Sequence, residues 1–103
     1  MHEVDRDKFE REQIRWRILK ALESGRPFPT SEMLILQVLQ DVSLQVTPHS
    51  LRRELDYLES RSLVELTGKS SPVWAAELTR LGVDLVEYTV PCEPGIGRPP
   101  KWY

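Results

Sequence analysis

The chain has 103 residues, of which 40% are hydrophobic and 29% charged, and its formal net charge at pH 7 is −2. This length suits one small globular domain and excludes two separate hydrophobic cores. There is no apolar run long enough to span a bilayer and no signal peptide, so we expect a cytoplasmic protein without a membrane partner. The single cysteine, Cys92, excludes an intramolecular disulfide and a cysteine-based metal cluster.

The first helix is predicted from about Asp7 to Ser24, where a glycine and two prolines end it. Its buried stripe recurs at positions i, i+4 and i+8, namely Ile14, Ile18 and Leu22. Phe9 and Trp16 lie on another side of this helix. They indicate either an interface with a second protomer or an aromatic ring that folds over the edge of one core.

Two further helices follow. Thr30 or Ser31 is expected to cap a helix that ends near Asp41. The third helix has the clearest start signal, with Thr47 suited to the N-cap and Pro48 to the first helical position. Its buried stripe is predicted to consist of three leucines, namely Leu51, Leu55 and Leu58.

The face of the third helix opposite the leucines is polar. At 100° per residue it carries His49, Arg53 and Asp56, flanked by Arg52 and Tyr57. Ser50 lies near its N-terminal end. The plain interpretation of this pattern is a solvated helix face.

Strands are predicted at Leu63 to Thr67 and at Val73 to Leu78, joined by the turn G-K-S-S-P. Thr79 can cap a last helix that runs to Tyr88 before Pro91. We therefore divide the chain into a domain at residues 1–90 and a Pro/Gly-rich tail at 91–103, expected to be extended and without a core of its own. The fold class is mainly α with a small β-hairpin.

The run T-P-H-S-L-R-R-E-L-D-Y-L-E-S-R-S-L-V-E-L resembles the recognition helix and first wing strand of winged helix-turn-helix proteins of the ArsR and MarR type. The run A-E-L-T-R-L-G-V-D-L resembles their second wing strand and last helix. More narrowly, the chain is similar to small ArsR-like proteins of Mu-like phages and prophages, whose tail is close to G-x-x-R-P. The resemblance implies a winged-helix fold and expression in a bacterial host. The metal-sensing ligands of ArsR-type sensors have no counterpart in the sequence.

Double-stranded DNA is the partner that this resemblance favours, even though the net charge of −2 argues against it. Arginine can bind a guanine edge or a phosphate with two parallel hydrogen bonds. The expected contacts lie on the third helix and the wing turn: His49, Ser50, Arg52, Arg53, Asp56, Tyr57 and Lys69. Together they would serve a transcription regulator or a DNA-handling factor of a phage or prophage.

The alternative is a protein-interaction module in phage assembly that does not bind DNA. The acidic balance, the short wing and four aromatic residues favour it: Phe9, Trp16, Trp102 and Tyr103. A homodimer is expected in the first case, and a phage or host protein partner in the second. Because no catalytic motif or metal-ligand spacing is present, we expect neither an enzyme nor a cofactor.

Overall fold

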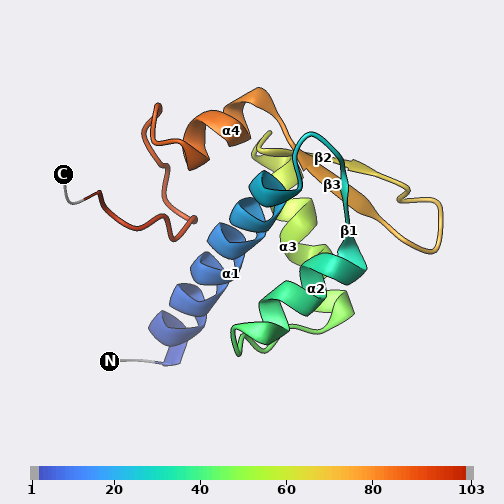
Figure 1. Ribbon diagram of the computed structural model, residues 1–103. Coiled ribbons are helices and arrows are strands. Elements are labelled where there is room, and N and C mark those ends of the chain that lie inside the picture. The colour runs from blue at the N-terminus through green and yellow to red at the C-terminus, as the bar shows by residue number, and fades with distance from the viewer. Residues whose placement is uncertain (1–2, 102–103) are drawn as a thin grey trace.

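The computed structural model describes residues 3–101, with side chains from residue 7 onward. Within these residues the chain forms four helices and a three-stranded antiparallel sheet (Figure 1), as the predicted α+β class requires. The helices are α1 (Glu3–Gly25), α2 (Glu32–Asp41), α3 (Pro48–Ser60) and α4 (Arg80–Val86). The strands are β1 (Thr30–Ser31), β2 (Val64–Thr67) and β3 (Ala75–Leu78). In the described part of the chain, no helix has the length and apolar character needed to cross a membrane.

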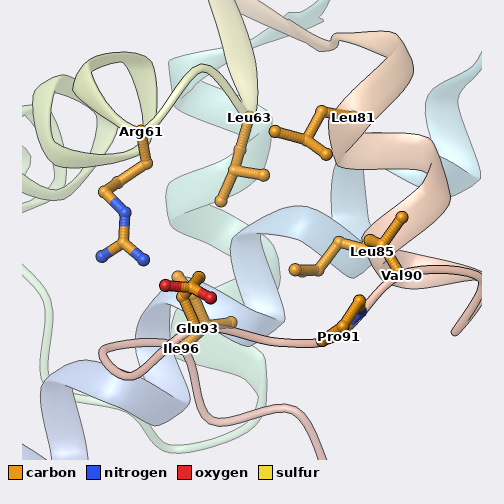
Figure 2. A pocket seen from close by; sticks show the side chains of 8 residues that line it. All are labelled: Arg61, Leu63, Leu81, Leu85, Val90, Pro91, Glu93 and Ile96. Atoms are coloured by element: carbon orange, nitrogen blue, oxygen red, sulfur yellow. The ribbon is translucent and has the colours of Figure 1, made fainter.

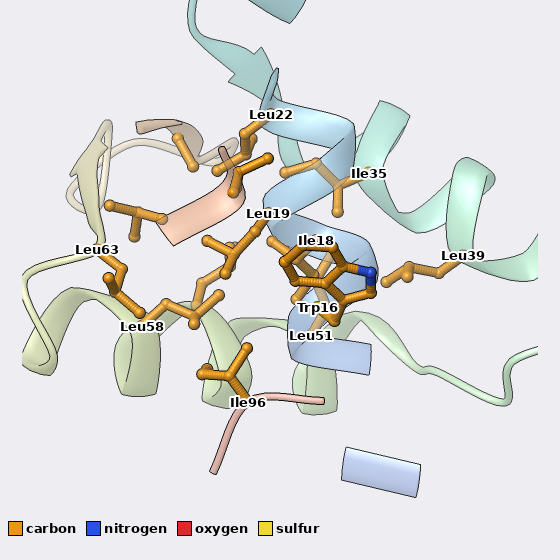
Figure 3. Packing of buried hydrophobic residues seen from close by; sticks show 14 of the residues in the cluster. Trp16, Ile18, Leu19, Leu22, Ile35, Leu39, Leu51, Leu58, Leu63 and Ile96 are labelled. Carbon is orange, nitrogen blue, oxygen red and sulfur yellow. The ribbon is translucent and has the colours of Figure 1, made fainter. Parts of the chain in front are cut away.

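The core lies around α1, which packs against α2, α3, α4 and β3 (Figure 3). Ile18 and Leu22 of the predicted stripe are buried, and Leu19 between them is also fully buried, whereas Ile14 is only half-buried. All three predicted leucines of α3 are buried. Burial of each such side chain contributes about 1.5–3 kcal/mol relative to exposure. Packing of α3 on this core fixes the orientation of α3 relative to α1, and so the direction in which its polar face points.

Side-chain caps start three of the helices where the sequence places them. Ser31 accepts a hydrogen bond from the backbone of Met33 at the start of α2. Thr47 and Ser50 form a reciprocal capping box at the start of α3, in which each side chain accepts from the other residue's backbone N–H. Thr79 caps α4. Such caps are worth about 1 kcal/mol each because they satisfy N–H groups that lack a partner within the helix.

Gly82 in the run L-T-R-L-G permits the close approach of α4 to the start of the sheet. A Cβ atom at this position would lie 2.2 Å from the carbonyl oxygen of Leu63, so no larger residue fits without a backbone shift. The Thr79 backbone N–H donates to the same carbonyl at 3.1 Å. The helix ends at Val86, two residues earlier than predicted, because Tyr88 adopts a left-handed conformation with a φ of 65°.

The sheet has the order β1-β3-β2, which differs from the predicted two-stranded hairpin. The additional strand, β1, has only two residues, and it pairs Thr30 with Ala76 and Ser31 with Ala75. Two residues are too few to give the alternating pattern that identifies a strand in a sequence. β3 also begins at Ala75 rather than Val73, since the N–H of Trp74 donates to a side chain of α2 and not to a strand.

Residues 91–101, here called the C-terminal strap, contain no helix or strand but pack along the domain. Ile96 is buried in the common core, and the N–H of Gly97 donates to the carbonyl of Glu12 on α1. Arg98 donates to two backbone carbonyls, those of Leu85 and Val90, at 2.9 Å each. The strap contains a turn at residues 94–96, and it shares the core of the domain. Arg98 therefore anchors the strap to the end of the domain.

Candidate nucleic-acid interface

The N-terminal half of α3 presents the predicted polar face to solvent. His49 and Arg53 are exposed, and the Arg53 side chain retains 57% of its accessible surface. The Ser50 hydroxyl, in contrast, is occupied by the helix cap: it accepts from the Thr47 N–H at 2.9 Å and lies 3.1 Å from the Thr47 carbonyl oxygen. Ser50 therefore shapes the start of α3 instead of offering a free hydroxyl to a ligand.

Arg52 points away from the polar face, toward α2 and the sheet. Its Nε and Nη2 atoms donate to the two carboxylate oxygens of Glu32, at 2.8 and 2.6 Å, and Nη2 also donates to the carbonyl of Pro72. The guanidinium lies 4.4 Å from the centre of the Trp74 ring. Because Nε and Nη2 are already used within the protein, Arg52 ties α3 to α2 and to the wing.

Glu32 is the acceptor at the centre of that contact. It is buried, and it also accepts the N–H of Trp74 at 2.7 Å. The hydrogen bonds from Arg52 lower the pKa of Glu32 below its ordinary value, with help from the Trp74 N–H, and outweigh the opposite effect of burial. The same pair raises the pKa of Arg52. An ionised Glu32 thus holds three structural elements together.

Lys69 at the turn between β2 and β3 folds back onto α3. Its ammonium lies 2.9 Å from a carboxylate oxygen of Asp56 and 3.2 Å from one of Glu59, and 5.1 Å from the centre of the Trp74 ring. These two carboxylates raise the pKa of Lys69, with Asp56 the larger influence. Asp56, predicted as a DNA contact, is therefore paired with the wing lysine. The wing turn therefore adds no net positive charge to this surface.

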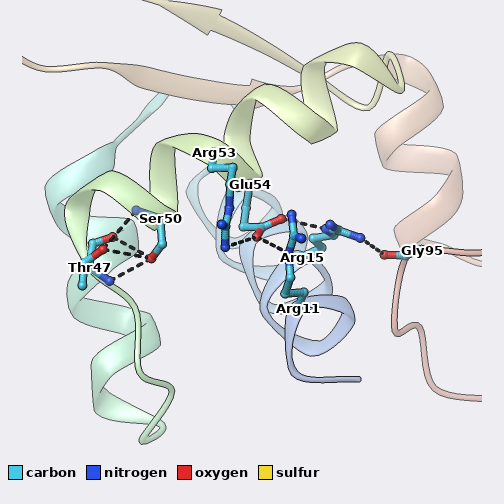
Figure 4. A network of polar contacts seen from close by, with 7 residues as sticks. All are labelled: Arg11, Arg15, Thr47, Ser50, Arg53, Glu54 and Gly95. Carbon is cyan, nitrogen blue, oxygen red and sulfur yellow. Dashed lines mark hydrogen bonds and ion pairs between the residues drawn. The ribbon is translucent and has the colours of Figure 1, made fainter. Parts of the chain in front are cut away.

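A net positive charge lies where α3 meets α1 (Figure 4). Three guanidinium groups surround the carboxylate of Glu54, which is only 1% exposed. Arg15 and Arg11 donate to it at 2.8 and 2.9 Å, and Arg53 lies 3.5 Å away. We call these four residues the arginine cluster. Three cations around one anion leave two formal positive charges, and Arg11 and Arg53 keep 32% and 57% of their side-chain surface exposed.

Tyr57 belongs to the support of this cluster and not to an outer surface. Its half-buried ring lies 3.6 Å from the guanidinium of Arg15, and its hydroxyl accepts a hydrogen bond from Arg61. Arg15 also donates to the carbonyl of Gly95 in the C-terminal strap, at 2.9 Å. The strap thereby helps to position the arginine cluster.

The predicted aromatic contacts fall into three groups. Trp16 is 8% exposed and packs edge-on against Tyr88, so its ring closes the edge of the domain's own core. Phe9 is 59% exposed on α1. Trp102 and Tyr103 lie outside the described residues. Of the proposed contacts, Phe9 alone is both described and free to meet a partner.

The sequence contained one signal for the arginine cluster. Leu51, Leu55 and Leu58 define the buried stripe, and position 54 falls between them on the same face of the helix. A carboxylate on a buried face needs cationic partners. These partners, Arg11 and Arg15, lie on α1, 43 and 39 residues before Glu54, and no local sequence pattern specifies that pairing.

Among residues 3–101, no group of three or more His, Cys, Asp or Glu side chains is arranged to hold a metal ion. Comparisons with protein-family models, with curated proteins and with solved structures gave no match to this chain.

Proposed function

We propose that the chain is a winged-helix protein that binds double-stranded DNA through the N-terminal half of α3. The order helix, strand, two helices, strand, turn, strand supports the winged-helix assignment, as does the β1-β3-β2 sheet with its two longer strands joined by the wing turn. In this assignment α2 and α3 form the helix-turn-helix pair. A fold alone does not define a function, so the argument rests on the surface of α3.

The observation that carries the proposal is the charge excess of the arginine cluster. Duplex DNA attracts proteins chiefly through cations placed at its phosphates. Arg53 lies on the outer face of α3 and Arg11 on the adjacent turn of α1, and both are partly exposed beside a single neutralising carboxylate. With α3 in the major groove, Arg53 and His49 would reach base edges or phosphates, while Arg11 would meet the flanking backbone.

This proposal changes the roles of two expected contacts. Arg52 and Lys69 are paired with carboxylates of the protein itself, so their contribution is to fix the angles of α2, α3 and the wing. Minor-groove binding by the wing would be slight. Affinity would accordingly be modest and only moderately dependent on salt concentration, since the salt dependence scales with the number of phosphate contacts and few are available here.

The test compares arginines of different placement on a labelled mixed-sequence duplex, by fluorescence anisotropy at low salt. Arg53→Gln and Arg11→Gln are each expected to weaken binding roughly three- to tenfold, because each removes one contact to DNA. Arg80→Gln is the matched control, because Arg80 is an exposed arginine (89%) far from the cluster. It borders the same hollow as Arg26, which follows the far end of α1, and that end lies ~20 Å along the helix from Arg11. Equal loss in all three variants would contradict the assigned surface, and absence of binding would contradict the proposal itself.

A second function, a protein-interaction module without DNA binding, is favoured by a different surface. Three large apolar side chains close to β1 in the sequence are more than half exposed: Phe28, which precedes the strand, and Met33 and Leu34, which lie in the first turn of α2. Exposed apolar groups gathered in one stretch are typical of contact surfaces. Light scattering of the purified protein tests whether this surface joins two copies of the chain. A dimer that becomes monomeric in Leu34→Glu, but not in Phe9→Glu, would assign the contact to this surface.

A further inference from the structure

A pocket of about 270 Å³ opens between the end of α3, the start of β2, α4 and the C-terminal strap (Figure 2). It lies away from the exposed end of α3. Its apolar wall includes Leu63, Leu81 and Leu85. An apolar cavity of about 150 Å³ is large enough for benzene, so this pocket can take a small aliphatic group with room for a polar head.

Two opposite charges stand at one end of the pocket, where Figure 2 shows the Arg61 guanidinium facing the Glu93 carboxylate. Arg61 uses Nη1 to donate to the hydroxyl of Tyr57 and to the carbonyl of Pro94. Its Nε and Nη2 atoms donate to no described residue. Glu93 is exposed, and its carboxylate has no partner among the described side chains.

We infer that this pocket binds a free α-amino acid with an aliphatic side chain. The ligand carboxylate would take the free donors of Arg61, and its ammonium would take the carboxylate of Glu93. The side chain would lie on the leucines. Charge-assisted hydrogen bonds of this kind are the strong ones, and Arg is suited to a carboxylate because its planar fork offers two parallel donors.

The charges at the pocket also exclude simpler ligands. A monocarboxylate would satisfy Arg61 but meet the repulsion of Glu93, and an amine would satisfy Glu93 but meet that of Arg61. A zwitterion satisfies both, and the apolar wall discriminates against amino acids that lack a side chain. The site therefore selects for all three parts of the ligand. The inference is independent of DNA binding, because neither charged residue lies on the proposed DNA-binding face.

The experiment follows backbone amide shifts of the ¹⁵N-labelled full chain during titration with L-leucine. Three probes each lack one part of the ligand: 4-methylpentanoate lacks the ammonium, 3-methylbutylamine the carboxylate and glycine the side chain. Leucine is expected to shift amides of β2, α4 and the strap and to bind about tenfold more tightly than each probe. For 4-methylpentanoate and 3-methylbutylamine this is the effect of one lost charge-assisted contact, and for glycine it is the effect of the lost apolar burial.

Glu93→Gln isolates the ammonium contact without disturbing the fold, since Glu93 is exposed and unpaired among the described residues. In this variant leucine should bind about tenfold more weakly, and 4-methylpentanoate should bind no more weakly than before. Glu65→Gln, on the exposed face of β2, is the matched control and should leave leucine binding unchanged. Absence of leucine-dependent shifts at the pocket, equal binding of all four compounds, or the same loss in both variants would overturn the inference.

Discussion

Replacement of Glu54 by glutamine tests the arginine cluster as a structural unit. The substitution keeps the shape of the side chain but removes the negative charge that, among the described side chains, the three guanidinium groups share. Loss of one partner of a buried ion pair costs about 3–5 kcal/mol, because the other charge stays buried. Arg15 retains only 9% of its side-chain surface and carries most of this cost.

The expected loss in the free energy of unfolding is about 3 kcal/mol, at the lower end of that range, because Arg11 and Arg53 are partly hydrated and the amide oxygen still accepts one hydrogen bond. For a chain of this size the melting temperature should fall by roughly 10–25 °C. Circular dichroism during thermal and urea unfolding measures both quantities.

Glu65→Gln is the control for this experiment. Glu65 is exposed on β2 and faces Glu77 across the sheet, so its neutralisation removes a like-charge contact and should leave the stability equal or slightly higher. At a temperature where Glu54→Gln remains folded, its additional positive charge should also tighten DNA binding. A fall in melting temperature of less than about 3 °C, typical of an exposed substitution, would refute the assignment of Glu54 as the buried centre.

Three further predictions concern the frame around this cluster. Glu32 has a folded-state pKa below its ordinary value of 4.5, so its contribution to stability is present above pH 4.5 and is lost as the pH falls through the lowered pKa. Glu32→Gln should therefore reduce the loss of the free energy of unfolding between pH 6 and pH 2, measured by urea unfolding. If the variant loses as much stability at low pH as the unmodified protein, the Glu32–Arg52 contact does not cause that loss. Ile96→Ala should lower the free energy of unfolding by about 2 kcal/mol and release the strap from the core. Limited proteolysis followed by mass spectrometry should then detect new cleavage after residue 90. An unchanged digestion pattern would show that Ile96 is not the anchor. Gly82→Ala should cost roughly 1–3 kcal/mol in urea unfolding, because its Cβ would press on the Leu63 carbonyl, and wild-type stability would contradict that close approach.

The helix starts could be predicted from the sequence because their causes are local. A capping side chain and the backbone N–H that it accepts are separated by two or three residues, as Thr47 and Ser50 illustrate. The leucine stripe of α3 is equally local, since helical periodicity alone determines it. These features establish the elements and their approximate bounds.

The site could be predicted only in part because the partners of its charges are distant in sequence. Arg52 and Arg53 are adjacent and chemically identical, yet one turns to Glu32 and the other borders Glu54. A rotation of 100° per residue separates their directions, and the acid that each meets is set by tertiary packing. Lys69 in the wing turn likewise pairs with Asp56 on α3, which lies 13 residues earlier in the chain. The sequence predicted Arg52, Arg53 and Lys69 as DNA contacts, but it did not determine which of them the protein's own carboxylates would occupy.

The most direct test of the central claim is the salt dependence of DNA binding by the unmodified protein and by Arg53→Gln. For two or three phosphate contacts, a plot of log K against log salt concentration should have a slope of about −2 to −3. The slope for Arg53→Gln should be less steep by about 1. Identical slopes for the two proteins would contradict the role given to Arg53, and a slope near zero, or no binding at low salt, would contradict DNA binding by this face of α3.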